Sequence, residues 1–355
     1  MKSSVLYCTT ALTLIAGSVS AGGIQRDIDR SQILFEKGKN YVEFNAATVS
    51  PNVSGSVGGA VGSGNIQSTY QNFSLGWKHQ YNEKLSFALY AQEPVGANVS
   101  YAPGTGYPFA GTNAEVNSLA VTGLAKYNFT DRISAYGGLR VQSLSGNVAI
   151  RTAGLPLPPA YNLTVDKDYQ VGYVLGAAYQ IPDIALKVAL TYESKIEHDF
   201  RDNAGTEFKV EIPQAVTLHA QTGVAQNTIV FGSARWQEWS KFEIRPMDFA
   251  GGVVALASEP SDIWTYEVGV GHRFTENWSG AFTVGYEEDR GDTVGNLSGR
   301  DGFISYGLAA KYSTEHWDVT TGIKYIDVGS ANTTIGANFS GNDAVAAGVK
   351  VGLRF

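Results

Sequence analysis

Apolar and polar residues alternate along much of the chain. From Tyr169 to Gln180 and from Trp317 to Tyr325, large apolar residues predominate at every second position, and the residues between them are mostly small or polar. Successive side chains of a β-strand point to opposite faces, so this period of two predicts strands. The same pattern occupies 264–274, 278–287, 304–312 and 344–355. Strands of soluble sheets are commonly about 5–6 residues long and tilted membrane-crossing strands about 9–11, so these lengths favour crossing a bilayer.

The segments between the strands alternate between short and long. Short turns are expected at 81–84, 128–132, 181–183, 226–227, 275–277 and 313–316, and longer loops near 58–65, 94–112, 147–167, 200–212, 240–262, 289–301 and 329–341. Six short turns and seven long loops connect fourteen strands. Outer-membrane barrels combine an even strand number with short periplasmic turns and long external loops. The pattern therefore predicts an all-β transmembrane antiparallel barrel of about 14 strands over 41–355, with both termini in the periplasm.

Aromatic residues gather at both ends of the predicted strands, as in the two aromatic girdles of membrane barrels. Trp77, Tyr127 and Trp278 lie beside short turns, and Tyr192, Trp264 and Tyr286 lie near long loops. Phe355, the last residue, follows apolar residues at every second position. We expect Phe355 to end the last strand at the periplasmic girdle. Such an ending resembles the signal read by the bacterial barrel-assembly machinery, which is therefore an expected partner.

The first 21 residues have the pattern of a secretory signal peptide. Lys2 precedes a short apolar run from Val5 to Ala16, and Val19-Ser20-Ala21 supplies small residues for cleavage. The run is shorter than the roughly 20 apolar residues that a spanning helix needs. Cys8, the only cysteine, lies in this segment. A mature chain from residue 22 therefore has no thiol for disulfides, catalysis or metal binding.

Composition argues against several other functions. Gly, Tyr, Phe and Trp number 41, 19, 16 and 6, and only 17% of residues are charged, which suits an exported β protein. The net charge of −7 argues against a nucleic-acid partner. The five histidines show no metal-binding spacing, and no nucleophile motif or phosphate-binding loop occurs. We therefore predict no enzyme activity, metal or cofactor.

Residues 22–40 differ from the rest of the chain because apolar residues are mixed with many charges. The segment precedes the first strand, near Tyr41, and so starts on the periplasmic side. We expect it to fold into the lumen as a hatch, with contacts to a hydrophobic ligand from Ile28, Ile33, Leu34 and Phe35. The open alternative is a disordered periplasmic leader.

Two further features concern the barrel wall. Six basic residues are expected to face inward near the short turns: Lys78, Lys126, Lys187, Arg273, Lys311 and Arg354. They would either form a positive ring at the periplasmic mouth or be merely solvated. Arg140 and Lys324, higher on the wall, are candidate partners for a ligand carboxylate. Pro94 removes a ladder donor in the third strand, so Pro94 and Gly96 are candidates for a lateral opening. In the alternative, Pro94 already belongs to the following loop.

Several segments resemble FadL-type outer-membrane transporters of long-chain fatty acids and other hydrophobic compounds. They are "IPQAVTLHAQTG" (212–223), "ARWQEWSKFEIRP" (234–246), "GVGHRFTENWSGAFTVGYEEDR" (269–290) and "LYAQEPVGANVSY" (89–101). The resemblance implies fourteen strands, an N-terminal hatch and a sideways opening in the wall. The hatch lacks the Asn-Pro-Ala tripeptide typical of that family, and the loops are modest in length.

The resulting hypothesis is passive uptake of long-chain fatty acids or other hydrophobic compounds through a plugged barrel with a lateral exit. The expected partners are hydrophobic small molecules and outer-membrane lipid, and we expect a monomer. The alternative is a general diffusion porin for small polar solutes, whose water-filled lumen needs no plug.

Overall fold

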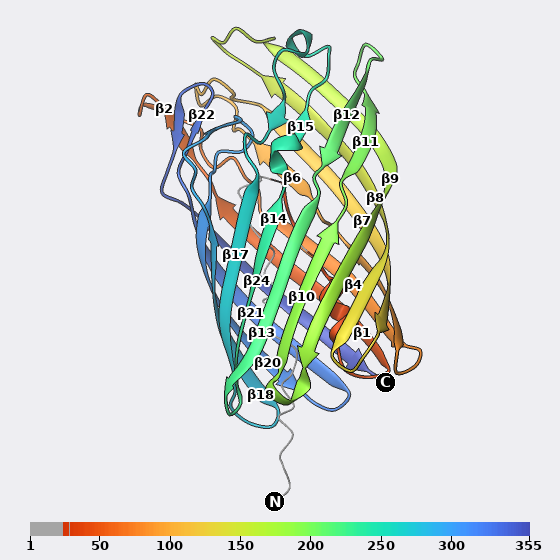
Figure 1. The fold of residues 1–355 in the computed structure, drawn as a ribbon. Helices are drawn as coiled ribbons and strands as arrows, with labels where there is room; N and C mark the ends of the chain where they lie inside the picture. The colour runs from red at the N-terminus through yellow and green to blue at the C-terminus, as the bar shows by residue number, and fades with distance from the viewer. Residues whose placement is uncertain (1–23, 28) are drawn as a thin grey trace, which may run out of the picture.

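The computed structural model describes residues 24–27 and 29–355, and its strands form a closed antiparallel barrel of 14 strands (Figure 1). The wall consists of β1 (Asn40–Asn52), β4 (Tyr70–Gln80), a third strand in two parts, β5 (Leu85–Gln92) and β6 (Gly96–Ser100), β7 (Asn113–Asn128), β8 (Ile133–Arg151), β9 (Ala160–Ile181), β10 (Leu186–Glu193), β13 (Ala215–Ala225), β14 (Thr228–Gln237), β17 (Ile263–Arg273), β18 (Trp278–Glu287), β20 (Phe303–Ser313), β21 (Trp317–Val328) and β24 (Asn342–Arg354). The first and last of these strands pair, with Tyr41 opposite Arg354, and close the barrel. The predicted fold class is confirmed.

The alternation seen in the sequence separates an outer from an inner face. Tyr169, Val171 and Tyr173 point outward and are exposed, whereas the positions between them face inward. An apolar outer band of this extent is what a bilayer covers in a membrane barrel. No helix among the described residues is long and apolar enough to span a membrane.

The six short turns lie where the sequence predicts them, but two of the long loops differ. Residues near 200–212 form a hairpin of β11 (Ile196–Arg201) and β12 (Glu207–Ile212) that leaves the main sheet. In addition, β8 and β9 extend past the expected membrane boundary, which leaves only residues 152–159 as a loop. In the β9 extension Tyr161 and Leu163 are buried, whereas Asn162 and Thr164 are exposed. The alternation is present in the sequence, but its outward-facing positions are polar, so it does not have the pattern of a lipid-facing strand.

The remaining loops cover the external end of the barrel (Figure 1). Five short strands form a second sheet: β2 (Gly55–Val57), β3 (Val61–Gly62), β19 (Thr293–Val294), β22 (Ala331–Thr333) and β23 (Ala337–Phe339). The loop from 238 to 262 contains η3 (Trp239–Lys241), β15 (Glu243–Ile244), η4 (Ala250–Gly252) and β16 (Ala257–Ser258). Trp239, Phe339 and Tyr101 are almost completely buried among these loops, which gives the external end a hydrophobic core of its own.

Buried charges join the 238–262 loop to the neighbouring 288–302 loop. Arg290 donates to the carbonyl of Asp262 at 2.9 Å and lies 3.4 Å from the Asp301 carboxylate. Glu259 lies in the same region and is only 8% exposed. Burial raises the pKa of the Glu259 carboxyl to about 8, although Arg300 and Arg290 oppose the shift. Glu259 is therefore held in its neutral form at mildly acidic pH.

We expect the 238–262 loop to become easier to open as pH rises from 4.5 to about 8. A carboxyl group whose pKa is higher in the folded than in the unfolded state contributes stability at low pH that is lost through this interval. Hydrogen exchange of the amides of residues 253–259, 261 and 262, corrected for intrinsic rates, should show loop opening that grows by up to about tenfold per pH unit. The Glu259→Gln variant should lose this dependence, and the exposed-site control Glu276→Gln should keep it. An unchanged profile in Glu259→Gln would refute the assignment.

Phe355 provides a test of assembly. Its backbone exchanges hydrogen bonds with Asn40 at 3.0 and 3.2 Å, while its side chain is 72% exposed. Because little of the ring is buried, Phe355→Ala should leave the melting temperature nearly unchanged but lower the amount of folded barrel in the outer membrane. Heat-modifiable gel migration measures that amount. Phe274→Ala, which removes another exposed aromatic ring from the same end of the barrel, is the control. Equal amounts of folded protein in both variants would contradict recognition of the terminal ring.

Candidate functional site

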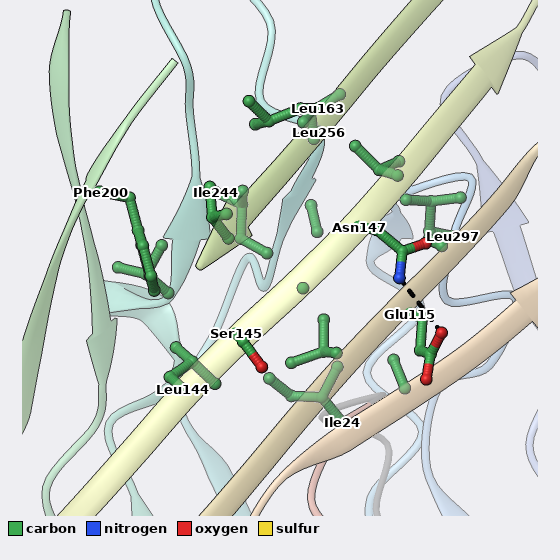
Figure 2. A pocket seen from close by; sticks show the side chains of 18 of the residues that line it. Ile24, Glu115, Leu144, Ser145, Asn147, Leu163, Phe200, Ile244, Leu256 and Leu297 are labelled. Atoms are coloured by element: carbon green, nitrogen blue, oxygen red, sulfur yellow. Dashed lines mark hydrogen bonds between the residues drawn. The ribbon is translucent and has the colours of Figure 1, made fainter. Parts of the chain in front are cut away.

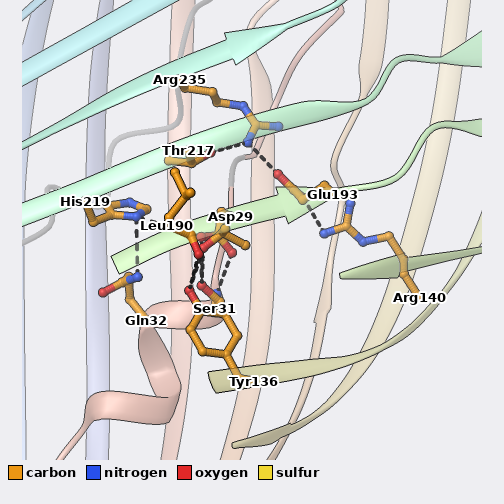
Figure 3. A network of polar contacts seen from close by, with 11 residues as sticks. Asp29, Ser31, Gln32, Tyr136, Arg140, Leu190, Glu193, Thr217, His219 and Arg235 are labelled. Atoms are coloured by element: carbon orange, nitrogen blue, oxygen red, sulfur yellow. Dashed lines mark hydrogen bonds and ion pairs between the residues drawn. The ribbon is translucent and has the colours of Figure 1, made fainter. Parts of the chain in front are cut away.

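The segment before β1 lies inside the barrel. Its 3-10 helix η1 (Ser31–Phe35) buries Ile33 and Leu34 against inward-facing wall residues that include Tyr90 and Tyr136. Polar contacts fix the same helix: the Ser31 hydroxyl lies 3.2 Å from Thr191 Oγ1, and Gln32 lies 3.4 Å from His219 Nδ1 (Figure 3). The described residues 24–27 and 29–39 are called the hatch below. Ile28 and the expected signal segment 1–21 lie outside the described residues.

Phe35 is also held by the wall. Its ring meets that of Tyr136 edge-on at 5.9 Å, and the ammonium groups of Lys126 and Lys187 lie 4.5 and 5.0 Å from its centre. Ile33, Leu34 and Phe35 therefore all contact the barrel wall. None of the three lines the apolar chamber described below.

A chain of three buried charges crosses the lumen above η1. Arg140 donates to Glu193 Oε1 and Arg235 donates to Glu193 Oε2, both at 2.5 Å (Figure 3). Two wall hydroxyls, on Thr122 and Thr217, accept further hydrogen bonds from the two guanidinium groups. The three side chains are each at most 8% exposed. The cluster retains one net positive charge, although Arg140 is not a free cation.

Lys324, the other candidate carboxylate partner, does not join this cluster. Its ammonium group pairs with Glu267 of β17 at 2.9 Å, whereas Arg140 of β8 pairs with Glu193 of β10. The two basic residues predicted from the sequence therefore belong to separate ion pairs.

A small polar cavity of about 20 Å³ adjoins the cluster. Several buried side-chain atoms at its wall have no hydrogen-bond partner among the described residues: both amide atoms of Gln142, Nε of Arg235 and Oε1 of Gln237. Buried polar atoms of this kind normally find a partner. The cavity is large enough for one water molecule or for the polar end of a ligand.

An apolar chamber of about 90 Å³ lies at the external end of the lumen (Figure 2). It adjoins the polar cavity, because Ile212 lines both. The barrel wall contributes Ala114 and Leu144, the hairpin contributes Phe200, and the 238–262 loop contributes Leu256. Ile24 of the hatch completes the wall, and the next residue, Gln25, lines the polar cavity. The site therefore has an apolar compartment and a polar end.

The wall of the barrel has a window beside the chamber. β5 pairs with β4 up to the pair of Leu75 with Ala91, and a bridge joins Gln67 to Val99 higher up. Between these two points β6 has no ladder with β4 and pairs only with β7. Pro94 and Gly96 lie at this window. The alternative that Pro94 begins the external loop is wrong, because a wall strand follows it.

The hatch fills the window as a short piece of strand. Arg26 N donates to Pro94 O at 3.0 Å, and Gly96 N donates to Ile24 O at 2.7 Å. On the other edge, the side-chain amide of Asn72 in β4 donates to Arg26 O at 2.8 Å. The hatch therefore satisfies backbone groups that a broken wall would leave unpaired in the bilayer.

Gly96 makes space for the Arg26 side chain. A Cβ atom at residue 96 would lie 2.5 Å from Arg26 Nε, so a larger residue there would displace the Arg26 side chain from its present position. The guanidinium carbon of Arg26 stacks 3.7 Å above the centre of the Tyr70 ring. Gly96 thus leaves room for the Arg26 side chain to stack on Tyr70 on the inner side of the wall.

Sequence reasoning missed three parts of the site: the pairing of Ile24 and Arg26 with the third strand, the two partners of the Arg140 cluster, and the hairpin. The hairpin had a usable signal, because Ile196, His198 and Phe200 alternate with charged residues, as do Phe208, Val210 and Ile212. Among the described residues, no group of three or more His, Cys, Asp or Glu could hold a metal ion.

Comparisons with known proteins agree with this architecture. The profile of the outer membrane protein transport protein family (OMPP1/FadL/TodX) matches residues 26–289, whereas no curated protein matches the chain. Among solved structures, a Pseudomonas aeruginosa FadL homologue is similar with a TM-score of 0.73 and 15% identity over 92% of this chain and 93% of that one. The Pseudomonas putida toluene transporter TodX (TM-score 0.67, 12% identity, 91% and 92%) and the Ralstonia pickettii toluene transporter TbuX (0.64, 12%, 90% and 90%) have the same fold. Since the family profile covers most of the sequence, the chain belongs to the OMPP1/FadL/TodX family of outer membrane transport proteins.

Proposed function

We propose that the protein carries compact hydrophobic molecules from the external side into the apolar chamber and releases them sideways into the outer membrane through the window beside Pro94 and Gly96. One observation carries the proposal: the same hatch segment, Ile24 to Asp27, borders the chamber, the polar cavity and the window. A displacement of this segment would connect all three.

The size of the chamber supports a compact substrate. An apolar protein cavity of about 150 Å³ accommodates benzene, and the chamber here measures about 90 Å³. A single ring therefore needs the chamber to expand by about 60 Å³. A long acyl chain gains about 0.8 kcal/mol for each buried CH₂, but most of it would need space that opens only when the hatch moves. The long-chain fatty acids expected from the sequence are the second candidate substrates, tested in parallel below.

A sideways path is favoured over a downward one. Ile33 and Leu34 close the lumen below the chamber, and the lower lumen is lined by lysines, which offer no favourable surface to a hydrocarbon. The window leads directly into lipid. Its cover is held by a few backbone hydrogen bonds, each with a net contribution of about 0.5–1.5 kcal/mol, and by the stacking of Arg26 on Tyr70. Opening the cover breaks these contacts without breaking the strand ladders of the barrel.

A polar group on the substrate would enter the small cavity beside the chamber. The side-chain amide of Gln142 and Nε of Arg235 have no hydrogen-bond partner there. Arg140 contributes to the net positive charge of the Arg140–Glu193–Arg235 cluster. This arrangement suits a neutral polar or weakly acidic end. In this function Arg140 contributes to binding the polar end, whereas Lys324, which pairs with Glu267, does not. Ile33, Leu34 and Phe35 dock the hatch against the wall, and a ligand contact of Ile28 stays a prediction.

The porin alternative is not favoured, because it requires an open aqueous path through a lumen in which the hatch is packed. Steady, large ion currents through the wild-type protein in a planar bilayer would revive it. Low conductance that rises when residues 24–35 are deleted would support the plugged barrel.

A chamber-filling variant tests the substrate class. Ala114 lines the chamber, and Ala125 on the same strand β7 is exposed on the outer face. Ala114→Phe should reduce uptake of labelled toluene by intact cells at least about fivefold, since the ring occupies substrate space. Ala125→Phe should leave uptake unchanged, and heat-modifiable gels verify folding of both variants. Uptake of oleate but not of toluene by the wild type would overturn the proposal of a compact substrate.

A disulfide across the window tests the exit. Gln25 and Val95 face each other as a narrow, non-hydrogen-bonded antiparallel pair, a geometry whose short Cα separation suits a disulfide. Oxidised Gln25→Cys/Val95→Cys protein should lose substrate uptake and regain it after reduction. Each single substitution serves as the control under oxidant. Full uptake by the cross-linked protein would exclude exit through this window.

A further inference from the structure

The periplasmic third of the lumen contains buried lysines without carboxylate partners. Lys78, Lys126, Lys187 and Lys350 project inward from β4, β7, β10 and β24 and are between 3% and 7% exposed. Within the described part of the chain, none of the four forms an ion pair. Lys311 is different, because it lies 3.3 Å from the Asp318 carboxylate, which also pairs with Arg354.

Two of these lysines converge on the hatch. The ammonium groups of Lys126 and Lys187 lie 4.5 and 5.0 Å from the centre of the same Phe35 ring. The two ammonium groups therefore lie beside one aromatic ring, although their positive charges repel each other. The ring attracts each cation through its quadrupole, but it supplies no formal negative charge.

The surrounding charges do not neutralise the pair. Lys78 donates to the carbonyl of Gly38 at 2.6 Å, and Lys350 is near enough to repel Lys187. Two carboxylates of the hatch act here: Glu36 attracts Lys78, Lys187 and Lys311 at once, and Asp29 also attracts Lys187. Two carboxylates shared among this larger number of ammonium groups leave an excess of positive charge in a space largely removed from bulk water. Such charges are stable only when they are paired.

We propose that Lys126 and Lys187 form a binding site for a small oxyanion beneath the hatch, with Lys78 and Lys350 adding to the positive field. Tetrahedral or carboxylate oxygens accept hydrogen bonds from several ammonium groups at once. Bound oxyanion bridges β7 to β10 across Phe35 and holds η1 in its docked position. The ligand chemistry is shared by inorganic phosphate from the periplasm and by the carboxylate of a transported acid.

The experiment uses the full-length mature protein in mild detergent, titrated by calorimetry with inorganic phosphate and, separately, with hexanoate at constant ionic strength. We expect saturable binding of at least one of the two and slower hydrogen exchange at residues 31–36 in its presence. Lys126→Gln/Lys187→Gln should weaken binding by about tenfold or more, the effect of losing charge-assisted hydrogen bonds. Lys84→Gln, an equal loss of charge at an exposed turn, should bind like the wild type.

The two ligands distinguish the source of the oxyanion. Binding of phosphate alone identifies an inorganic ligand, and binding of hexanoate alone identifies the head group of a hydrophobic acid; both support the site. Lys126→Arg/Lys187→Arg, which retains both charges, should keep binding and exclude simple misfolding as the cause of a loss. Absence of saturable binding in the wild type, or equal binding by the double Gln variant, would overturn the proposal.

Discussion

The structure depends on one constraint: within a bilayer, every backbone donor and acceptor must be paired inside the protein. A closed barrel meets this requirement for all its strands except the third, where Pro94 interrupts the ladder and β6 has no pairing with β4. The hatch completes the wall through Arg26 and Ile24, which share hydrogen bonds with Pro94 and Gly96. The break in the third strand leaves backbone groups without a wall partner, and Ile24 and Arg26 of the hatch supply those partners.

This pairing connects the wall to the interior. The residues that cover the window come immediately before η1, whose Ile33 and Leu34 are buried in the lumen. They also contribute Ile24 to the apolar chamber. Movement of the hatch would therefore affect the chamber, the polar cavity and the wall together. A hydrophobic molecule that displaces Ile24 would enter the chamber, and the same displacement would open its path to the lipid.

The sequence predicted the barrel well because lipid imposes a strict pattern. Runs such as Tyr169 to Tyr179 alternate without exception on the outer face, and strand number and turn positions followed from that rule. The break at Pro94 was a candidate for a different reason, because proline removes a ladder donor. The interior was predicted less well because no periodic rule governs it. Arg140 was identified as an inward-facing base, but its partners lie on other strands. Glu193 follows Arg140 by 53 residues along the chain, and Arg235 follows Glu193 by 42. Their meeting depends on barrel closure. The hairpin with Phe200 was assigned to a loop because its outer face is charged.

The central claim is that substrate opens the window by displacing the hatch segment from the third strand. Hydrogen exchange of the backbone amides of Arg26 and Gly96, measured in detergent with and without saturating toluene, tests it most directly. Both amides donate across the window. The account predicts faster exchange at these two amides when toluene is present, with no change in the β1 ladder at Phe44. Unchanged or slower exchange at Arg26 and Gly96, in protein that transports toluene, would contradict it.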